Sequence, residues 1–111
     1  MNIQTFDTVI KDQLALCADM LTRKGHEYAG EAERDTTVDR LEHFKKAAVL
    51  TDSTAKQALL GMLAKHLVSI ADMCKKGRYP TGVWTEKITD SINYLLILRA
   101  LVEEDQINET D

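Results

Sequence analysis

Apolar residues recur every three to four positions over most of the chain, a period typical of amphipathic helices. A first helix is predicted from about residue 5 to 24. Three more are predicted at about 37–50, 54–76 and 83–104. The sequence therefore predicts four helices separated by shorter polar segments.

Each predicted helix carries a stripe of apolar positions that we expect to be buried. In the first two helices these positions are Phe6, Ile10, Leu14, Cys17 and Leu21, then Val38, Leu41, Phe44 and Ala48. In the third helix they are Leu60, Leu63, Leu67, Ile70 and Cys74. One side of the fourth helix is formed by Ile88, Ile92, Leu95 and Val102.

Capping signals set the expected ends of these helices. Gly25 is predicted to end the first helix, because glycine is the usual residue just beyond a helix C-terminus. Thr36 is the expected N-cap of the second helix, and Asp52 or Ser53 that of the third. Gly77, which follows two lysines, is predicted to end the third helix.

The expected fold class is all-α, a four-helix up-and-down bundle with one long first connection. That connection, residues 25–35, is longer than most helix–helix loops. The chain has one Pro and five Gly, a composition that favours long helices over strands and turns. Residues 1–104 are predicted to form a single domain, and 105–111 a polar C-terminal tail.

Composition and charge exclude several classes of partner. The net charge of −4 argues against sequence-independent nucleic-acid binding, which needs a basic face. The longest strongly apolar run, 94–98, is too short to span a membrane, and no charged-then-apolar leader opens the chain. A cytoplasmic protein is expected. Cys17 and Cys74 lie far apart without a CxxC spacing, so reduced thiols are expected.

Two of the predicted helices are apolar on most sides yet keep a polar stripe at i, i+4 and i+7. In the last helix the stripe is Glu86, Asp90 and Asn93. In the third helix it is Lys65, Ser69 and Asp72. Helices that are apolar nearly all round are normally buried on most sides, and a bundle of this size cannot bury both. We therefore expect a homo-oligomer, a dimer or larger, with the stripes inside the assembly or along a cleft.

The polar stripes have two interpretations. In the first they form a structural network, in which Lys65 pairs with Glu86 or Asp90 and Asn93 bonds a backbone group. In the second they form a ligand site. Carboxylates are the ligands that Mg²⁺ prefers, and this ion often bridges a protein to phosphates.

In the ligand-site interpretation, Asp72, Glu86 and Asp90 hold the metal. Lys65 and Ser69 then contact a phosphate. Asn93 orients the ligand or a water molecule. The preceding connection could contribute Lys24 to a phosphate and Tyr28 to a base by stacking. The alternative for these two residues is a lysine that favours the helix C-terminus and a tyrosine packed on the bundle.

The segment TEKITDSINYLLIL resembles the last core helix of the MazG-like all-α nucleoside triphosphate pyrophosphatases, with Glu86 and Asp90 matching its acidic positions. The chain also resembles small bacteriophage proteins with a K-x-x-x-YAG loop, matched at 24–30, and a KH-x-x-SI-x-D helix, matched at 65–72. The resemblance implies helical dimers or tetramers, Mg²⁺ held by carboxylates, and cleavage of a triphosphate to monophosphate and pyrophosphate.

The chain departs from that family at two places. Lys87 occupies a position where the family usually has Glu, and the third helix carries Lys65, Ser69 and Asp72 in place of an ExxE motif. Two functions are therefore expected. One is a Mg²⁺-dependent nucleoside triphosphate pyrophosphohydrolase. The other is a non-catalytic helical oligomer, such as a phage accessory protein, that binds or sequesters a nucleotide or a nucleotide-derived signal.

Overall fold

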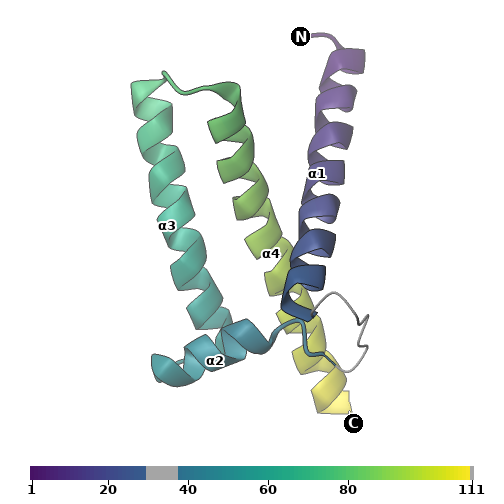
Figure 1. Ribbon diagram of the computed structural model, residues 1–111, viewed down its shortest axis with the longest axis vertical. Coiled ribbons are helices and arrows are strands. Elements are labelled where there is room, and N and C mark those ends of the chain that lie inside the picture. The colour runs from purple at the N-terminus through teal and green to yellow at the C-terminus, as the bar shows by residue number, and fades with distance from the viewer. Residues whose placement is uncertain (30–37, 111) are drawn as a thin grey trace. The chain divides into compact units, whose positions relative to one another are not determined.

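A computed structural model describes residues 1–29 and 38–110, with side chains described for 1–23 and 38–109. The described residues form four helices and no strand: α1 (Ile3–Ala29), α2 (Glu42–Leu50), α3 (Ala55–Lys76) and α4 (Thr81–Thr110) (Figure 1). The predicted all-α class is confirmed. No helix within these ranges combines the length and the apolar character that a membrane span requires.

The chain divides into two compact units, residues 1–38 and 39–111. The first contains α1, which begins where the Thr5 N–H donates a hydrogen bond of 2.8 Å to the side chain of Asn2. The predicted end at Gly25 is wrong, because α1 continues to Ala29. A single glycine inside a helix costs about 1 kcal/mol relative to alanine, which is too little to end a helix among good helix formers.

The second unit contains α2, α3 and α4, and α2 begins later than predicted. Its first residue is Glu42, preceded by a turn in which the Asp39 side chain accepts a hydrogen bond of 2.9 Å from the Leu41 N–H. Thr36, the expected N-cap, lies outside the described residues. With nine residues α2 is too short to run beside α3, and Figure 1 shows it crossing the end of α3.

The ends of α3 are fixed by a capping box and a glycine. Thr54 is the N-cap: its hydroxyl accepts a bond of 3.1 Å from the Gln57 N–H, and the Gln57 side chain accepts one of 2.9 Å from the Thr54 N–H. The prediction of Asp52 or Ser53 was therefore wrong by one or two residues. Gly77 ends α3 in the left-handed conformation, with φ of 68°, and this prediction is confirmed.

Helices α3 and α4 form an antiparallel hairpin joined by residues 77–80 (Figure 1). Helix α4 continues past the predicted end near residue 104 to Thr110, so most of the expected polar tail is helical. Two contacts fix the register of the hairpin. Leu59 and Leu101 belong to one buried cluster, and the rings of His66 and Tyr94 lie 5.2 Å apart. In both pairs the residue numbers add up to 160.

The core of the second unit is built from all three of its helices. Phe44 of α2, Leu59 of α3 and Leu101 of α4 form the buried cluster. Met62 and Ile97 are among the half-buried residues that pack against it. Along α3 the buried positions continue from Leu59 through Leu63 to Met73, with half-buried His66 between them.

The predicted apolar stripe of α3 is largely wrong. Leu60, Leu67 and Cys74 are exposed, whereas Leu63 is buried as expected. The reason is that α3 carries two apolar stripes one residue apart, and the buried one contains His66, which a search for apolar residues passes over. Both cysteines are free thiols, as expected.

The same error affects α4. Ile88, Leu95 and Val102, predicted to form its packed side, are exposed. The side that packs against α3 includes Ser91, Tyr94 and Leu101 instead. The Ser91 hydroxyl donates a bond of 2.8 Å to the Lys87 carbonyl, so the helix backbone itself satisfies this buried polar group.

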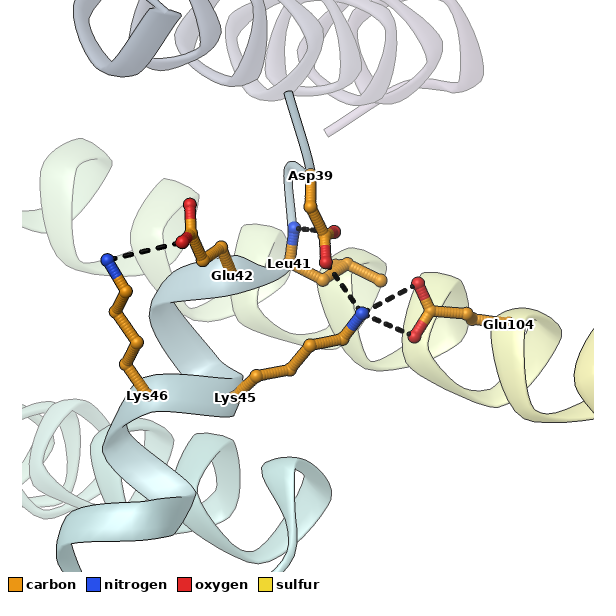
Figure 2. A network of polar contacts seen from close by, with 6 residues as sticks. All are labelled: Asp39, Leu41, Glu42, Lys45, Lys46 and Glu104. Atoms are coloured by element: carbon orange, nitrogen blue, oxygen red, sulfur yellow. Dashed lines mark hydrogen bonds and ion pairs between the residues drawn. The ribbon is translucent and has the colours of Figure 1, made fainter. Parts of the chain in front are cut away.

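Lys45 joins α2 to the end of α4 (Figure 2). Its ammonium group lies 2.6 Å from the Asp39 carboxylate and 2.8 Å from that of Glu104. The hydrogen bond from Lys45, and then that from the Leu41 N–H, lower the pKa of Asp39. The hydrogen bonds to Asp39 and Glu104 raise the pKa of Lys45.

We expect Lys45→Met to lower the free energy of unfolding by about 0.5–1 kcal/mol at neutral pH, because the pairs are partly exposed. Since the folded-state pKa of Asp39 is lowered, its contribution is present above the ordinary value of 3.8 and is lost as the pH falls through the folded-state value. Since the pKa of Lys45 is raised, its contribution is present below 10.5 and is lost as the pH rises through the folded-state value.

Urea denaturation from pH 2 to 9 measures this difference. The difference in free energy of unfolding between wild type and Lys45→Met should be constant from about pH 5 to 9 and should become smaller below about pH 4. Lys46→Met is the control, because the pair that Lys46 makes with Glu42 is an exposed i, i+4 pair, so its loss should lower the free energy of unfolding less. If the difference in free energy of unfolding is the same at pH 2 as at pH 7, the pairing of Lys45 with Asp39 does not account for it.

Candidate functional site

The two polar stripes lie on the same face of the α3–α4 hairpin. Residues three, four or seven apart share one side of a helix. On α3, Lys65 and Ser69 follow Met62 by three and seven positions. On α4, Asn93 and Asp90 precede Ile97 by four and seven. Since Met62 and Ile97 pack against the same cluster, which includes Phe44 of α2, both stripes lie on the side of the hairpin that α2 contacts.

We call this side the polar face and define it by Lys65, Ser69, Asp72, Glu86, Asp90 and Asn93. The register of the hairpin, in which facing residue numbers add up to about 160, sets which members lie at the same height. Lys65 lies level with Asn93, and Ser69 with Asp90. Asp72 lies level with Glu86, nearest the turn. The six residues that were predicted for α3 and α4 thus lie along one side of the hairpin, spread over about two helical turns.

Asn93 is the most unusual member of the polar face. It is only 6% exposed, yet among the described residues neither its Oδ1 nor its Nδ2 has a hydrogen-bond partner. A buried polar group without a partner costs about 1–3 kcal/mol. The amide therefore keeps one acceptor and two N–H donors available for a group that the described residues do not supply.

His66 is a second buried polar group on this hairpin, and the sequence placed it only at the edge of the polar stripe. Its ring lies against Tyr94, and its Nδ1 is buried without a hydrogen-bond partner among the described residues. The role of Tyr94 was missed. The sequence contains one signal for this contact. His66 and Tyr94 lie 28 residues apart, at nearly equal distances from the turn between α3 and α4, so an antiparallel hairpin sets them opposite each other.

The structural interpretation of the stripes required an ion pair from Lys65 to Glu86 or Asp90. Within the described side chains no such ion pair is formed. The register gives the reason: Lys65 lies level with Asn93, about one helical turn from Asp90 and two turns from Glu86. The carboxylates of the polar face are therefore not neutralised by the lysine of the same face.

The acidic members of the polar face were predicted to bind Mg²⁺. Asp72 and Glu86 are exposed and Asp90 is half-buried. Over the part of the chain that the structure describes, no three His, Cys, Asp or Glu side chains converge as metal ligands. Mg²⁺ is often held by one or two carboxylates together with substrate phosphates and water. Glu86 and Asp90, one turn apart on α4, are the pair that fits this mode.

Lys24 and Tyr28 were predicted to act from a loop over the ligand. Both positions instead belong to the last turns of α1, which continues to Ala29. Their side chains lie outside the described residues, so their proposed contacts with a phosphate and a base stay predictions.

Comparison of the chain with protein-family models, with curated proteins and with solved structures found no match. The resemblance to the MazG-like pyrophosphatases therefore stays a prediction from the sequence.

Proposed function

We propose that the polar face binds a nucleotide or a nucleotide-derived small molecule, and that it does so without turning it over. The observation that carries this proposal is the buried Asn93 amide, whose donors and acceptor have no partner among the described residues. Nucleobases present donors and acceptors side by side on their edges, and an asparagine can bind such a pair with two hydrogen bonds. A ligand of this kind would remove the cost of the unpaired amide.

The other members of the polar face supply a place for phosphate. Lys65 is exposed, lies level with Asn93 and makes no ion pair among the described residues, so its ammonium group is available to an anion. Ser69, one turn further along α3, adds a hydroxyl donor. This division assigns the base to α4 and the phosphate to α3.

A second candidate is the Mg²⁺-dependent pyrophosphohydrolase that the resemblance implies. It is favoured by Glu86 and Asp90, which share one side of α4, and by Asp72, which lies level with Glu86. When bound, Mg²⁺ would offset the charge of the phosphates. Glu86 and Asp90 would hold it, and Lys65 would stabilise negative charge on the phosphate oxygens.

Calorimetric titration with nucleoside mono-, di- and triphosphates, each with Mg²⁺ or with EDTA, tests the proposal. We expect binding that persists in EDTA and that Asn93→Leu weakens at least about tenfold, since two hydrogen bonds are lost. Ser91→Ala is the matched control, because Ser91 is equally buried but already bonded within α4. Absence of binding to every nucleotide in both buffers would overturn the proposal.

Pyrophosphate release, measured in the Mg²⁺ arm, separates the two candidates. No release above the level of Asp90→Asn is expected if the chain only binds its ligand. Release that Asp90→Asn abolishes, together with binding that requires Mg²⁺, would replace the binding function with the enzymatic one.

A further inference from the structure

Among the described side chains, three buried nitrogen or oxygen atoms lack a hydrogen-bond partner, and all three lie on the α3–α4 hairpin. They are Nδ1 of His66 on α3 and both Oδ1 and Nδ2 of Asn93 on α4. Folded proteins contain few such atoms, and each one needs a physical explanation. Their occurrence in two residues, one from each helix of a packed pair, points to a single cause.

His66 and Asn93 lie at the same height and on the same side of the hairpin. Their residue numbers add up to 159, whereas the contact between His66 and Tyr94 sets the register at 160. The difference of one residue is about 1.5 Å along a helix. His66 follows Met62 by four positions, and Asn93 precedes Ile97 by four. Both therefore lie on the side of the hairpin that packs against the α2 cluster.

Contact with the Tyr94 ring orients His66. The two ring centroids are 5.2 Å apart, and the rings are tilted by 43°. A neutral imidazole is a donor at one nitrogen and an acceptor at the other. Nε2 is not among the buried atoms without a partner, so it either reaches solvent or is bonded. A proton at Nε2 is therefore satisfied, whereas a proton at Nδ1 would be a buried donor without a partner. We assign the proton to Nε2, which leaves Nδ1 as an acceptor.

We propose that His66 and Asn93 together bind the base of the ligand, and that this base is guanine. The inference rests on the proposed function and adds the identity of the base to it. The Watson–Crick edge of guanine offers three groups in a row, the 2-amino group, N1–H and O6. The amino group donates to Nδ1 of His66, and N1–H donates to Oδ1 of Asn93. Nδ2 of Asn93 donates to O6, so that one base satisfies all three atoms.

The Watson–Crick edges of the other common bases do not satisfy the three atoms together. When Asn93 binds cytosine or uracil with two hydrogen bonds, the carbonyl O2 of the base faces Nδ1 of His66, and two acceptors repel each other. Adenine has a C–H group at the corresponding place. His66 thus contacts the base from the buried side of α3, whereas the neighbouring Lys65 is exposed and remains available to the phosphate.

Inosine monophosphate (IMP) tests the contact with His66, because its base is guanine without the 2-amino group. Calorimetric titration in EDTA at pH 8, which favours the neutral imidazole, compares it with guanosine monophosphate (GMP). We expect the wild type to bind GMP at least about tenfold more tightly than IMP, because IMP leaves Nδ1 without a partner. His66→Phe keeps a ring against Tyr94 but removes Nδ1, so GMP and IMP should then bind within about threefold of each other.

His66→Asn separates loss of the acceptor from a change in packing. The side-chain oxygen of asparagine can take the position of Nδ1, so this variant should still prefer GMP by at least about fivefold. His43→Phe is the matched control, because His43 is exposed on α2 and lies edge-on to Phe44. It should leave the preference within about twofold of the wild-type value.

The outcomes distinguish failure of this inference from failure of the proposed function. If the wild type binds GMP and IMP equally and Asn93→Leu weakens both, guanine recognition by His66 is overturned and the proposed function stands. Tighter binding of cytidine monophosphate than of GMP would also overturn it, because Nδ1 would then be a donor. So would a His66→Phe variant that keeps the preference for GMP, since His66 would then be structural. Absence of binding to every nucleotide would overturn both.

Discussion

Replacement of Leu59 by alanine is expected to lower the free energy of unfolding by about 2–5 kcal/mol, which is a large share of the stability of a small domain. Leu59 has no solvent-exposed surface and belongs to one buried cluster with Phe44 and Leu101. These three residues come from three helices, so a cavity at Leu59 weakens the packing between all three helices of the second unit. Few atoms can move to fill it, because both neighbours are held on separate helices.

Urea denaturation followed by far-UV circular dichroism measures this loss. Leu50→Ala is the control, because Leu50 is 87% exposed and its truncation should change the free energy of unfolding by no more than about 0.5 kcal/mol. A cost for Leu59→Ala below about 1 kcal/mol would contradict the position of Leu59 at the centre of the core.

Asn93→Leu is expected to stabilise the protein, in contrast to Leu59→Ala. The free energy of unfolding should rise by about 1–3 kcal/mol. The wild-type amide is buried without hydrogen bonds among the described residues, whereas leucine has a similar volume and no polar group to satisfy. A substitution that stabilises the free chain and weakens the ligand complex is the mark of a residue kept for binding, because function then costs stability.

The same denaturation experiment tests this gain. Ser91→Ala serves as the control: its hydroxyl is bonded within α4, so its removal should not stabilise the chain. A loss of stability in Asn93→Leu would show that the amide has a partner in the free protein. Asn93 would then be structural, and the main support for the proposed ligand site would be lost.

The helical fold could be predicted because it depends on local signals. The period of the apolar residues gave four helices, and Gly77 marked the end of α3 because only a residue that tolerates positive φ suits that position. The ends of α1 and α2 were predicted less well. Gly25 has only a small intrinsic cost inside a helix. The start of α2 depends on the turn that Asp39 makes with Leu41, which propensity does not reveal.

The choice of the buried side of α3 and α4 could not be made from the sequence, because each helix has two apolar sides. Leu59 and Leu60 are adjacent and identical, yet one is fully buried and the other exposed. The buried stripe of Leu59 and Leu63 also contains His66, whose ring lies 5.2 Å from that of Tyr94 on the partner helix. Whether a histidine within an apolar stripe is buried can be decided only when the residue that packs against it is known.

The candidate site was predicted in part. The spacing of the two polar stripes follows from helix geometry alone, and their common face follows once α3 and α4 are known to pack as a hairpin. The burial of Asn93, in contrast with the exposure of Glu86 on the same stripe, depends on packing around α4 and has no sequence signal.

The polar face of the hairpin also restricts where the chain can change in length. One inserted residue turns the following part of a helix by about 100°, so an insertion within α3 would move Lys65 and Ser69 away from their α4 counterparts. It would also bring exposed leucines towards the core. Seven residues add nearly two full turns and keep each side chain on its side of the helix, but they also move it about 10 Å along the axis, so the facing helix would need the same insertion to keep the pairs level. Changes in length should therefore be tolerated at 51–53 and 77–80, and within α3 and α4 only as matched steps of seven in both helices.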